Sequence, residues 1–387
     1  MTNRRQVIFL LVALLLPAFG FYAKLGFVAD PHLQALFFGL SILGAAFLLS
    51  WASETAQLDI SKSLAFAVLA LIAILPEYAV DIYFSWTAAS QPEYAAYASA
   101  NMTGANRLLI GLGWSLVVFL TWIKFRKSKI ELKKSERVEL SFLFFASLYA
   151  FVIALKGSFS LVDTVVLSAL FIYYIFRVSR THKEEPHLVG PAKMLGSFSR
   201  NRRRLSVVLL MLFSAVVIFE SAEPFAESLI TSGKSAGVDE FLLIQWVAPL
   251  ASEAPEFIIA LIFVLRALAR SGFEVLLSSK INQWTLLVAT IPLAYSLALG
   301  APSEMVMDAR QVEEIFLTAA QSLFAMSVML NLRITLKGAT TLFVLFMIQF
   351  FLPATHIAIS VVYLVLAAYL FWRDRAHIKP LIMGIVR

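Results

Sequence analysis

The chain has 387 residues, of which 60% are hydrophobic and 15% charged, with no cysteine and a net charge of +7. Soluble proteins are about 45–50% apolar and about 25% charged, so a soluble globule with a polar shell is excluded. The lack of cysteine excludes disulfides and thiolate metal sites. This composition predicts a polytopic membrane protein.

A membrane-spanning helix needs roughly 17–25 mostly apolar residues. The sequence shows no alternating ten-residue pattern of the kind that forms membrane β-barrels, so we expect an all-α protein. Twelve segments are candidate spanning helices: 7–22, 33–51, 63–86, 104–123, 138–155, 161–176, 205–230, 241–268, 278–299, 315–332, 339–352 and 356–372.

Basic residues predict the orientation, because Lys and Arg gather in cytoplasmic loops. With Arg4 and Arg5 inside, both termini are cytoplasmic, and we expect the cell (inner) membrane. The first segment is alternatively a signal peptide, although residues 17–20 offer no small-x-small cleavage site. The outer side then keeps only Lys24, Arg107, Lys156, Lys234 and Arg310.

The third segment carries carboxylates, which cost roughly 2.5–3.5 kcal/mol each at a helix centre. Ala70, Ala73, Glu77, Asp81 and Ser85 fall on one face at helical spacing. Pro76, directly before Glu77, removes a backbone donor and frees a carbonyl. A single such Glu often only pairs with a Lys or caps a broken helix, so a purely structural role is the alternative.

The eighth segment repeats this pattern, since Ser252 and Glu253 precede a second Pro-Glu pair that ends at Glu256. Asn101 follows Glu77 by 24 residues, and Lys280 follows Glu256 by the same 24 residues. A three-residue gap instead pairs Asn282 with Asn106.

The predicted topology runs the third and eighth segments in opposite directions, so the repeated motif is an inverted repeat. Inverted repeats with broken helices are typical of secondary transporters that bind ions near the bilayer midplane. Carboxylates, amides and freed carbonyls are hard oxygen ligands for Na⁺, Ca²⁺ or a proton. Four carboxylates nearer segment ends are candidates for a solvated vestibule or for a loop: Glu54, Glu220, Glu223 and Glu227.

Segments 52–114 and 220–296 resemble the two alpha repeats of the calcium/cation antiporter superfamily, the sodium/calcium exchanger membrane-region family. That family has a small-residue run ending in Pro-Glu, followed by a Gly-Asn-x-x-Gly-Ser-Asn helix start. The chain is similar to a divergent, prokaryotic-type sodium:proton exchanger-like member, because Lys280 stands where the spacing predicts an Asn or Asp. The five histidines form no ligand set.

The resemblance implies a ten-helix exchanger core with an added helix at each end. We expect an extra N-terminal helix in 1–30, a first inverted repeat in 31–178 and a cytoplasmic linker in 179–204. A second inverted repeat follows in 205–352, and 353–387 holds the extra C-terminal helix and cytoplasmic tail.

The sequence and the resemblance together predict a secondary active cation antiporter that exchanges Na⁺ for H⁺. Alternatives are Ca²⁺/H⁺ or Na⁺/Ca²⁺ exchange and, from another class, a cation channel. No enzyme motif is found, and the expected partners are the bilayer and the transported cations, with no cofactor and no nucleic acid; a homo-oligomer is left open. Glu77 and Glu256 are the expected metal ligands and proton acceptors. Asp81, Glu253, Asn101, Asn106, Ser252 and Asn282 complete the expected site, and Lys280 is either a counter-charge within it or a loop residue.

Overall fold

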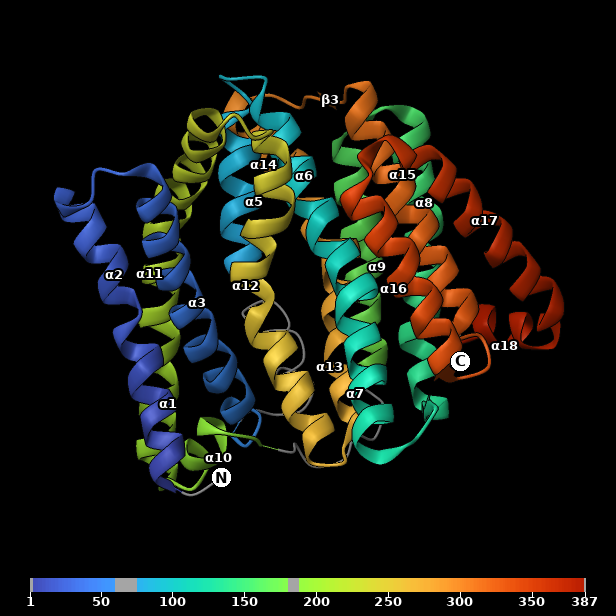
Figure 1. Ribbon diagram of the computed structural model, residues 1–387, viewed down its shortest axis with the longest axis horizontal. Coiled ribbons are helices and arrows are strands. Elements are labelled where there is room, and N and C mark those ends of the chain that lie inside the picture. Colours follow the sequence, from blue (N-terminus) through green and yellow to red (C-terminus); the bar gives the residue numbers. More distant parts are fainter. Residues whose placement is uncertain (1–2, 60–74, 180–187, 386–387) are drawn as a thin grey trace. The chain divides into compact units, whose positions relative to one another are not determined.

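The computed structural model describes residues 3–59, 75–179 and 188–385 (Figure 1). Within these residues, eight helices are long and apolar enough to cross a membrane, which confirms the all-α polytopic fold. The chain divides into two compact units. The first unit is Met1–Tyr83 with Ser179–Glu256, and the second unit is Phe84–Val178 with Phe257–Arg387.

The first unit is built around α3 and the long helix α11, which pack along each other (Figure 1). The hydroxyls of Ser41 on α3 and Ser221 on α11 lie 3.1 Å apart. The side chain of Asp30 begins α3 by accepting the amide of Leu33 at 2.9 Å. The helices wholly or largely in this unit are α1 Asn3–Leu15, α2 Pro17–Tyr22, η1 Ala23–Phe27, α3 Pro31–Ala56, α5 Leu75–Thr87, α10 Pro191–Gly196, α11 Arg200–Ala236 and α12 Glu240–Leu265.

The second unit packs α15 against α6, α8 and α17 (Figure 1). Two short antiparallel ladders join its loops, β1 with β4 and β2 with β3. Its elements are α6 Tyr94–Leu108, η2 Leu109–Trp114, α7 Ser115–Phe125, β1 Lys129–Glu131, η3 Lys134–Glu136, α8 Arg137–Lys156, β2 Ser158–Phe159, α9 Leu161–Ser179, α13 Ala269–Asn282, η4 Gln283–Leu287, α14 Val288–Leu299, β3 Met305–Val306, α15 Ala309–Val328, β4 Arg333–Thr335, α16 Leu336–Phe351, η5 Pro353–Thr355, α17 His356–Arg373, η6 Arg375–His377 and α18 Ile378–Met383.

Two helix starts predicted from the sequence are too late in the chain. The fourth segment was expected from 104 and the ninth from 278, whereas their helices begin at Tyr94 and Ala269. Hydropathy places a helix start after a polar run, but these polar runs lie inside the helices. The break at Pro353 is confirmed, since α16 ends at Phe351 and α17 begins at His356. Ala70 and Ala73 lie outside the described residues.

Candidate functional site

The first unit gathers the predicted carboxylates. Glu77 and Asp81 lie on α5, and Ser252, Glu253 and Glu256 lie on α12; all five side chains are buried. Glu77 interacts electrostatically with Asp81, Glu253 and Glu256. The structure therefore brings together the two Pro-Glu motifs, which the sequence separates by 179 residues.

Proline shapes the α12 part of this carboxylate group. Pro249 and Pro255 both lie inside the helix, and a proline cannot donate to the carbonyl four residues earlier. Two carbonyl oxygens of α12 thus lack their usual helical donor. The Ser252 hydroxyl lies 3.3 Å from the carbonyl oxygen of Pro249 and 3.4 Å from that of Ala248. Backbone and side-chain oxygens therefore occur together around Glu253 and Glu256.

Glu77 and Glu256 each have one carboxylate oxygen that can accept a proton or a cation. Oε2 of each is buried and has no hydrogen-bond partner among the described residues. A buried carboxylate oxygen in this state costs free energy unless a proton or a cation binds to it. In the described parts of the chain no three His, Asp or Glu side chains form a preformed metal cluster.

The second unit holds the four other predicted site residues. Asn101 and Asn106 lie on α6, and Lys280 and Asn282 lie on α13, all at most 2% exposed. The Lys280 ammonium donates to Oδ1 of Asn106 at 2.6 Å, and Nδ2 of Asn106 donates to the Met102 carbonyl at 2.8 Å. The alternative that places Lys280 in a cytoplasmic loop is therefore wrong.

Both asparagine-bearing helices widen just after their polar residues. A π-helical stretch, η2, begins at Leu109 after Asn106, and another, η4, begins at Gln283 after Asn282. Such π-bulges often occur at functional sites. Their positions favour the alignment that pairs Asn282 with Asn106 over the one that pairs Lys280 with Asn101.

The four candidate vestibule residues differ in their surroundings. Glu54 on α3 accepts a hydrogen bond from the Val189 backbone and interacts electrostatically with Glu256. Tyr83 donates to Glu227 at 2.6 Å, and Glu220 forms an ion pair with Lys24. Glu223 is exposed. Glu54 is thus linked to the carboxylate group.

Three buried charged or titratable residues were missed by sequence reasoning. Arg107 was placed at the outer end of the fourth segment, whereas it lies near the end of α6 and is fully buried. It forms an ion pair with Glu314 of α15, and Glu314 also contacts His356. An arginine within a long apolar stretch was the available signal, but the predicted helix start at 104 made Arg107 look like a residue at the helix end.

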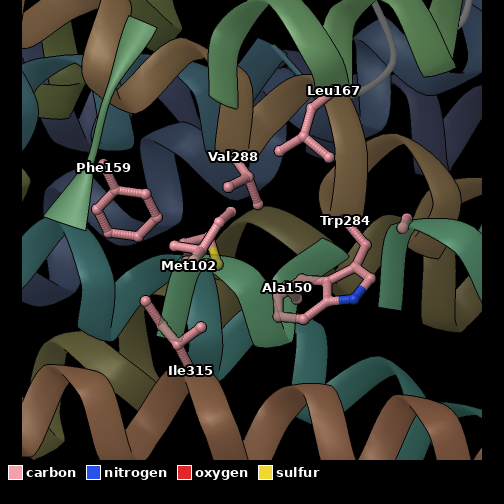
Figure 2. Close-up of a pocket in the computed structure, with 9 residues that line it drawn as sticks. Met102, Ala150, Phe159, Leu167, Trp284, Val288 and Ile315 are labelled. Atoms are coloured by element: carbon pink, nitrogen blue, oxygen red, sulfur yellow. The ribbon is translucent and has the colours of Figure 1, made fainter. Parts of the chain in front are cut away.

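The second unit also has a small apolar cavity (Figure 2). Its lining includes Met102, Phe159, Trp284, Val288 and Ile315, which Figure 2 shows pointing toward one another. The described lining offers no carboxylate or amide oxygen, so this cavity lacks the chemistry of a cation site.

Comparison with known proteins places the chain among ion exchangers. A family model described as sodium/calcium exchanger protein matches residues 31–180. The crystal structure of the H⁺/Ca²⁺ exchanger CAX is 42% identical, with a TM-score of 0.95, and the match covers 100% of this chain and 98% of that one. A comparison with curated protein sequences gives no match.

Two more distant structures share the fold alone. YfkE is 14% identical with a TM-score of 0.63, over 92% of this chain and 99% of that one. The sodium-calcium exchanger NCX_Mj is 18% identical with a TM-score of 0.55, over 81% of this chain and 96% of that one. Together with the identity to CAX along the whole chain, these matches confirm the resemblance seen in the alpha repeats. This membrane protein is a cation exchanger, not an enzyme, and belongs to the calcium/cation antiporter superfamily.

Proposed function

We propose that the protein exchanges Ca²⁺ for H⁺ by alternating access. The buried group of Glu77, Asp81, Glu253 and Glu256 carries this proposal, because several carboxylates can hold either a divalent cation or more than one proton. The 42% identity to an H⁺/Ca²⁺ exchanger supports the same choice of exchanged ions.

In the proposed mechanism Glu77 and Glu256 are the central ligands and proton acceptors. Their Oε2 atoms, which lack a partner among the described residues, bind Ca²⁺ when deprotonated. Asp81, Glu253 and Ser252 add oxygens in the first unit. Glu54, which interacts electrostatically with Glu256 in the same unit, is proposed to lie on the path toward it.

Competition between cation and protons makes the exchange obligatory. A buried group of carboxylates cannot remain fully charged without a counter-ion, because low dielectric penalises the charges and they repel one another. Ca²⁺ binding therefore expels protons, and Ca²⁺ release requires protons to return. The repeats then expose the loaded site to one side or the other. We place the protein in the cell (inner) membrane with both termini in the cytoplasm.

Na⁺/H⁺ exchange, the first expectation from the sequence, remains the second candidate. One observation favours it: the buried Lys280 ammonium brings a fixed positive charge to Asn106. A fixed cation near a site opposes a divalent ion more than a monovalent one.

Transport in proteoliposomes separates the two candidates. With an acidic interior and an alkaline exterior, Ca²⁺ should enter in exchange for protons and the interior should become alkaline in step. Glu223→Gln, at an exposed carboxylate, is the matched control and should transport as the wild type does. Uptake of Na⁺ but not Ca²⁺ under the same gradient would reject the proposal in favour of the second candidate.

A further inference from the structure

Three helices of the second unit meet at a buried Arg-Glu-His network. Arg107 of α6, Glu314 of α15 and His356 of α17 are 0%, 1% and 4% exposed. Oε2 of Glu314 pairs with the Arg107 guanidinium, and Oε1 of Glu314 lies 3.3 Å from Nδ1 of His356. Both carboxylate oxygens are thus engaged, one by each basic group.

The other ring nitrogen of His356 fixes how many protons this network needs. Nε2 lies 2.9 Å from the carbonyl oxygen of Gln349, which can only accept a hydrogen bond. A neutral imidazole has one N–H and so can satisfy either this carbonyl or the Glu314 carboxylate. If Nε2 carries the N–H and donates to Gln349, the lone pair of Nδ1 faces Oε1 of Glu314 unless a further proton lies between these two atoms.

The surrounding groups set the charge balance. Arg107 on α6 and Glu314 on α15 together are neutral, so an extra proton makes the network a buried cation. Tyr363, two turns beyond His356 on α17 and fully buried, interacts electrostatically with Arg107. The cost of holding this proton therefore depends on Arg107, whose charge opposes it, and on Glu314, whose charge favours it.

The network is joined to the polar part of α6. Arg107 directly follows Asn106, whose side chain binds Lys280. Gln321 donates to the Arg107 carbonyl at 3.4 Å, and Gln349 donates to Gln321 at 3.4 Å, while the Gln349 carbonyl faces His356. These hydrogen bonds connect His356 to the turn of α6 that holds Asn106.

We propose that Glu314 and His356 bind one proton between them, forming a proton site separate in the chain from the Glu77 and Glu256 carboxylates. Arg107 is the positioning residue that transmits the occupancy of this site to Asn106. The proton site stands on its own geometry, and only its coupling to transport rests on the proposed Ca²⁺/H⁺ exchange.

Nitrogen NMR of histidine-labelled protein at pH 7 tests the site without any transport. His356→Gln assigns the His356 signals, and His32→Gln, at an exposed histidine, controls for labelling. In the wild type both His356 nitrogens should report hydrogen-bonded protons. In Glu314→Gln the amide can donate to Nδ1, so the Nδ1 proton should be lost. A wild-type Nδ1 with a free lone pair, or nitrogen shifts unchanged in Glu314→Gln, would overturn the proton site.

Transport measurements test the coupling separately. In His356→Gln the ratio of exchange rates at pH 6 and pH 8 should change by about threefold or more, because the proposed proton site has lost one of its two groups. Arg107→Lys, which keeps the charge, should retain more of the wild-type pH profile than Arg107→Gln. If His356→Gln exchanges at a normal rate and its pH profile is unchanged, the coupling is rejected. If the wild type shows no Ca²⁺/H⁺ exchange, the proposed function is rejected instead.

Discussion

The Lys280 ammonium donates a 2.6 Å hydrogen bond to Asn106 and lies 4.2 Å from the centre of the Trp284 ring. Hydrogen bonding and cation–π attraction both stabilise the charged form of a lysine. Lys280 therefore donates to the amide oxygen of Asn106, a residue predicted from the sequence to be an ion ligand. We expect the charge and the hydrogen bond of Lys280 to have separable effects.

Lys280→Gln removes the charge and keeps a donor for Asn106, whereas Lys280→Met removes both. We expect Lys280→Gln to lower the apparent Ca²⁺ Km by about threefold to tenfold, because one positive charge no longer opposes a divalent ion. Lys280→Met should also lower thermal stability, since it leaves the buried Asn106 carbonyl without its donor. Ca²⁺ flux and thermal unfolding measure the two effects; an unchanged Km in both variants would remove Lys280 from the mechanism.

Glu77→Gln and Glu256→Gln should each reduce exchange by about a hundredfold or more, because an amide neither carries the charge nor releases a proton. Both variants should remain folded, since glutamine matches the size of glutamate. Flux in proteoliposomes and size-exclusion chromatography test this pair, with Glu223→Gln as the control. Wild-type flux in both variants would refute the site assignment.

Gly111 in the π-helical stretch η2 lies against Phe346 of α16. A Cβ at this position would lie 2.2 Å from Cγ of Phe346, so Gly111→Ala should destabilise the fold by about 1–3 kcal/mol through overpacking. Thermal unfolding measures the loss. Adding Phe346→Leu should restore part of the stability, and a stability loss equal in the single and double variants would contradict this contact.

Asp59 follows α3 and binds Arg203 through both carboxylate oxygens, at 2.6 and 2.9 Å. This hydrogen-bonded pair lowers the pKa of the Asp59 carboxyl, and the Arg204 charge adds to the effect. The stabilisation is therefore complete above the ordinary pKa of about 3.9 and is lost as the pH falls through the lower folded value. Asp59→Asn should cost about 0.5–1 kcal/mol.

Thermal unfolding of Asp59→Asn between pH 5 and pH 8 checks this predicted pH dependence of the stabilisation. The difference from the wild type should stay constant across that range and shrink only below the ordinary pKa of about 3.9. Glu131→Gln, at an exposed pair with Lys129, should change stability little. A difference that disappears already at pH 5 would show that another group titrates.

The two central carboxylates could be predicted from the sequence because each carries a local signal. Glu77 and Glu256 each follow a proline inside an apolar segment, and a charge there is costly enough to indicate a site. In the structure Glu77 on α5 interacts electrostatically with Glu256 on α12 of the same unit. The polytopic fold followed from hydropathy in the same way.

Other features depend on long-range packing and could not be read locally. Arg107 and Glu314 are 207 residues apart, and each alone looks like a residue near a helix end. The stretches before residues 104 and 278 looked like loops, because hydropathy does not show that α6 and α13 begin earlier, at Tyr94 and Ala269. Lys280 was ambiguous for the same reason until its contact with Asn106 placed it inside α13.

The central claim is that Ca²⁺ and protons compete for the carboxylates of Glu77 and Glu256. Calorimetric titration of the purified protein with Ca²⁺, in buffers of different ionisation enthalpy, counts the protons released on binding. The account predicts proton release at pH 7 in the wild type and clearly less in Glu77→Gln and Glu256→Gln. Ca²⁺ binding without proton release in the wild type would contradict it.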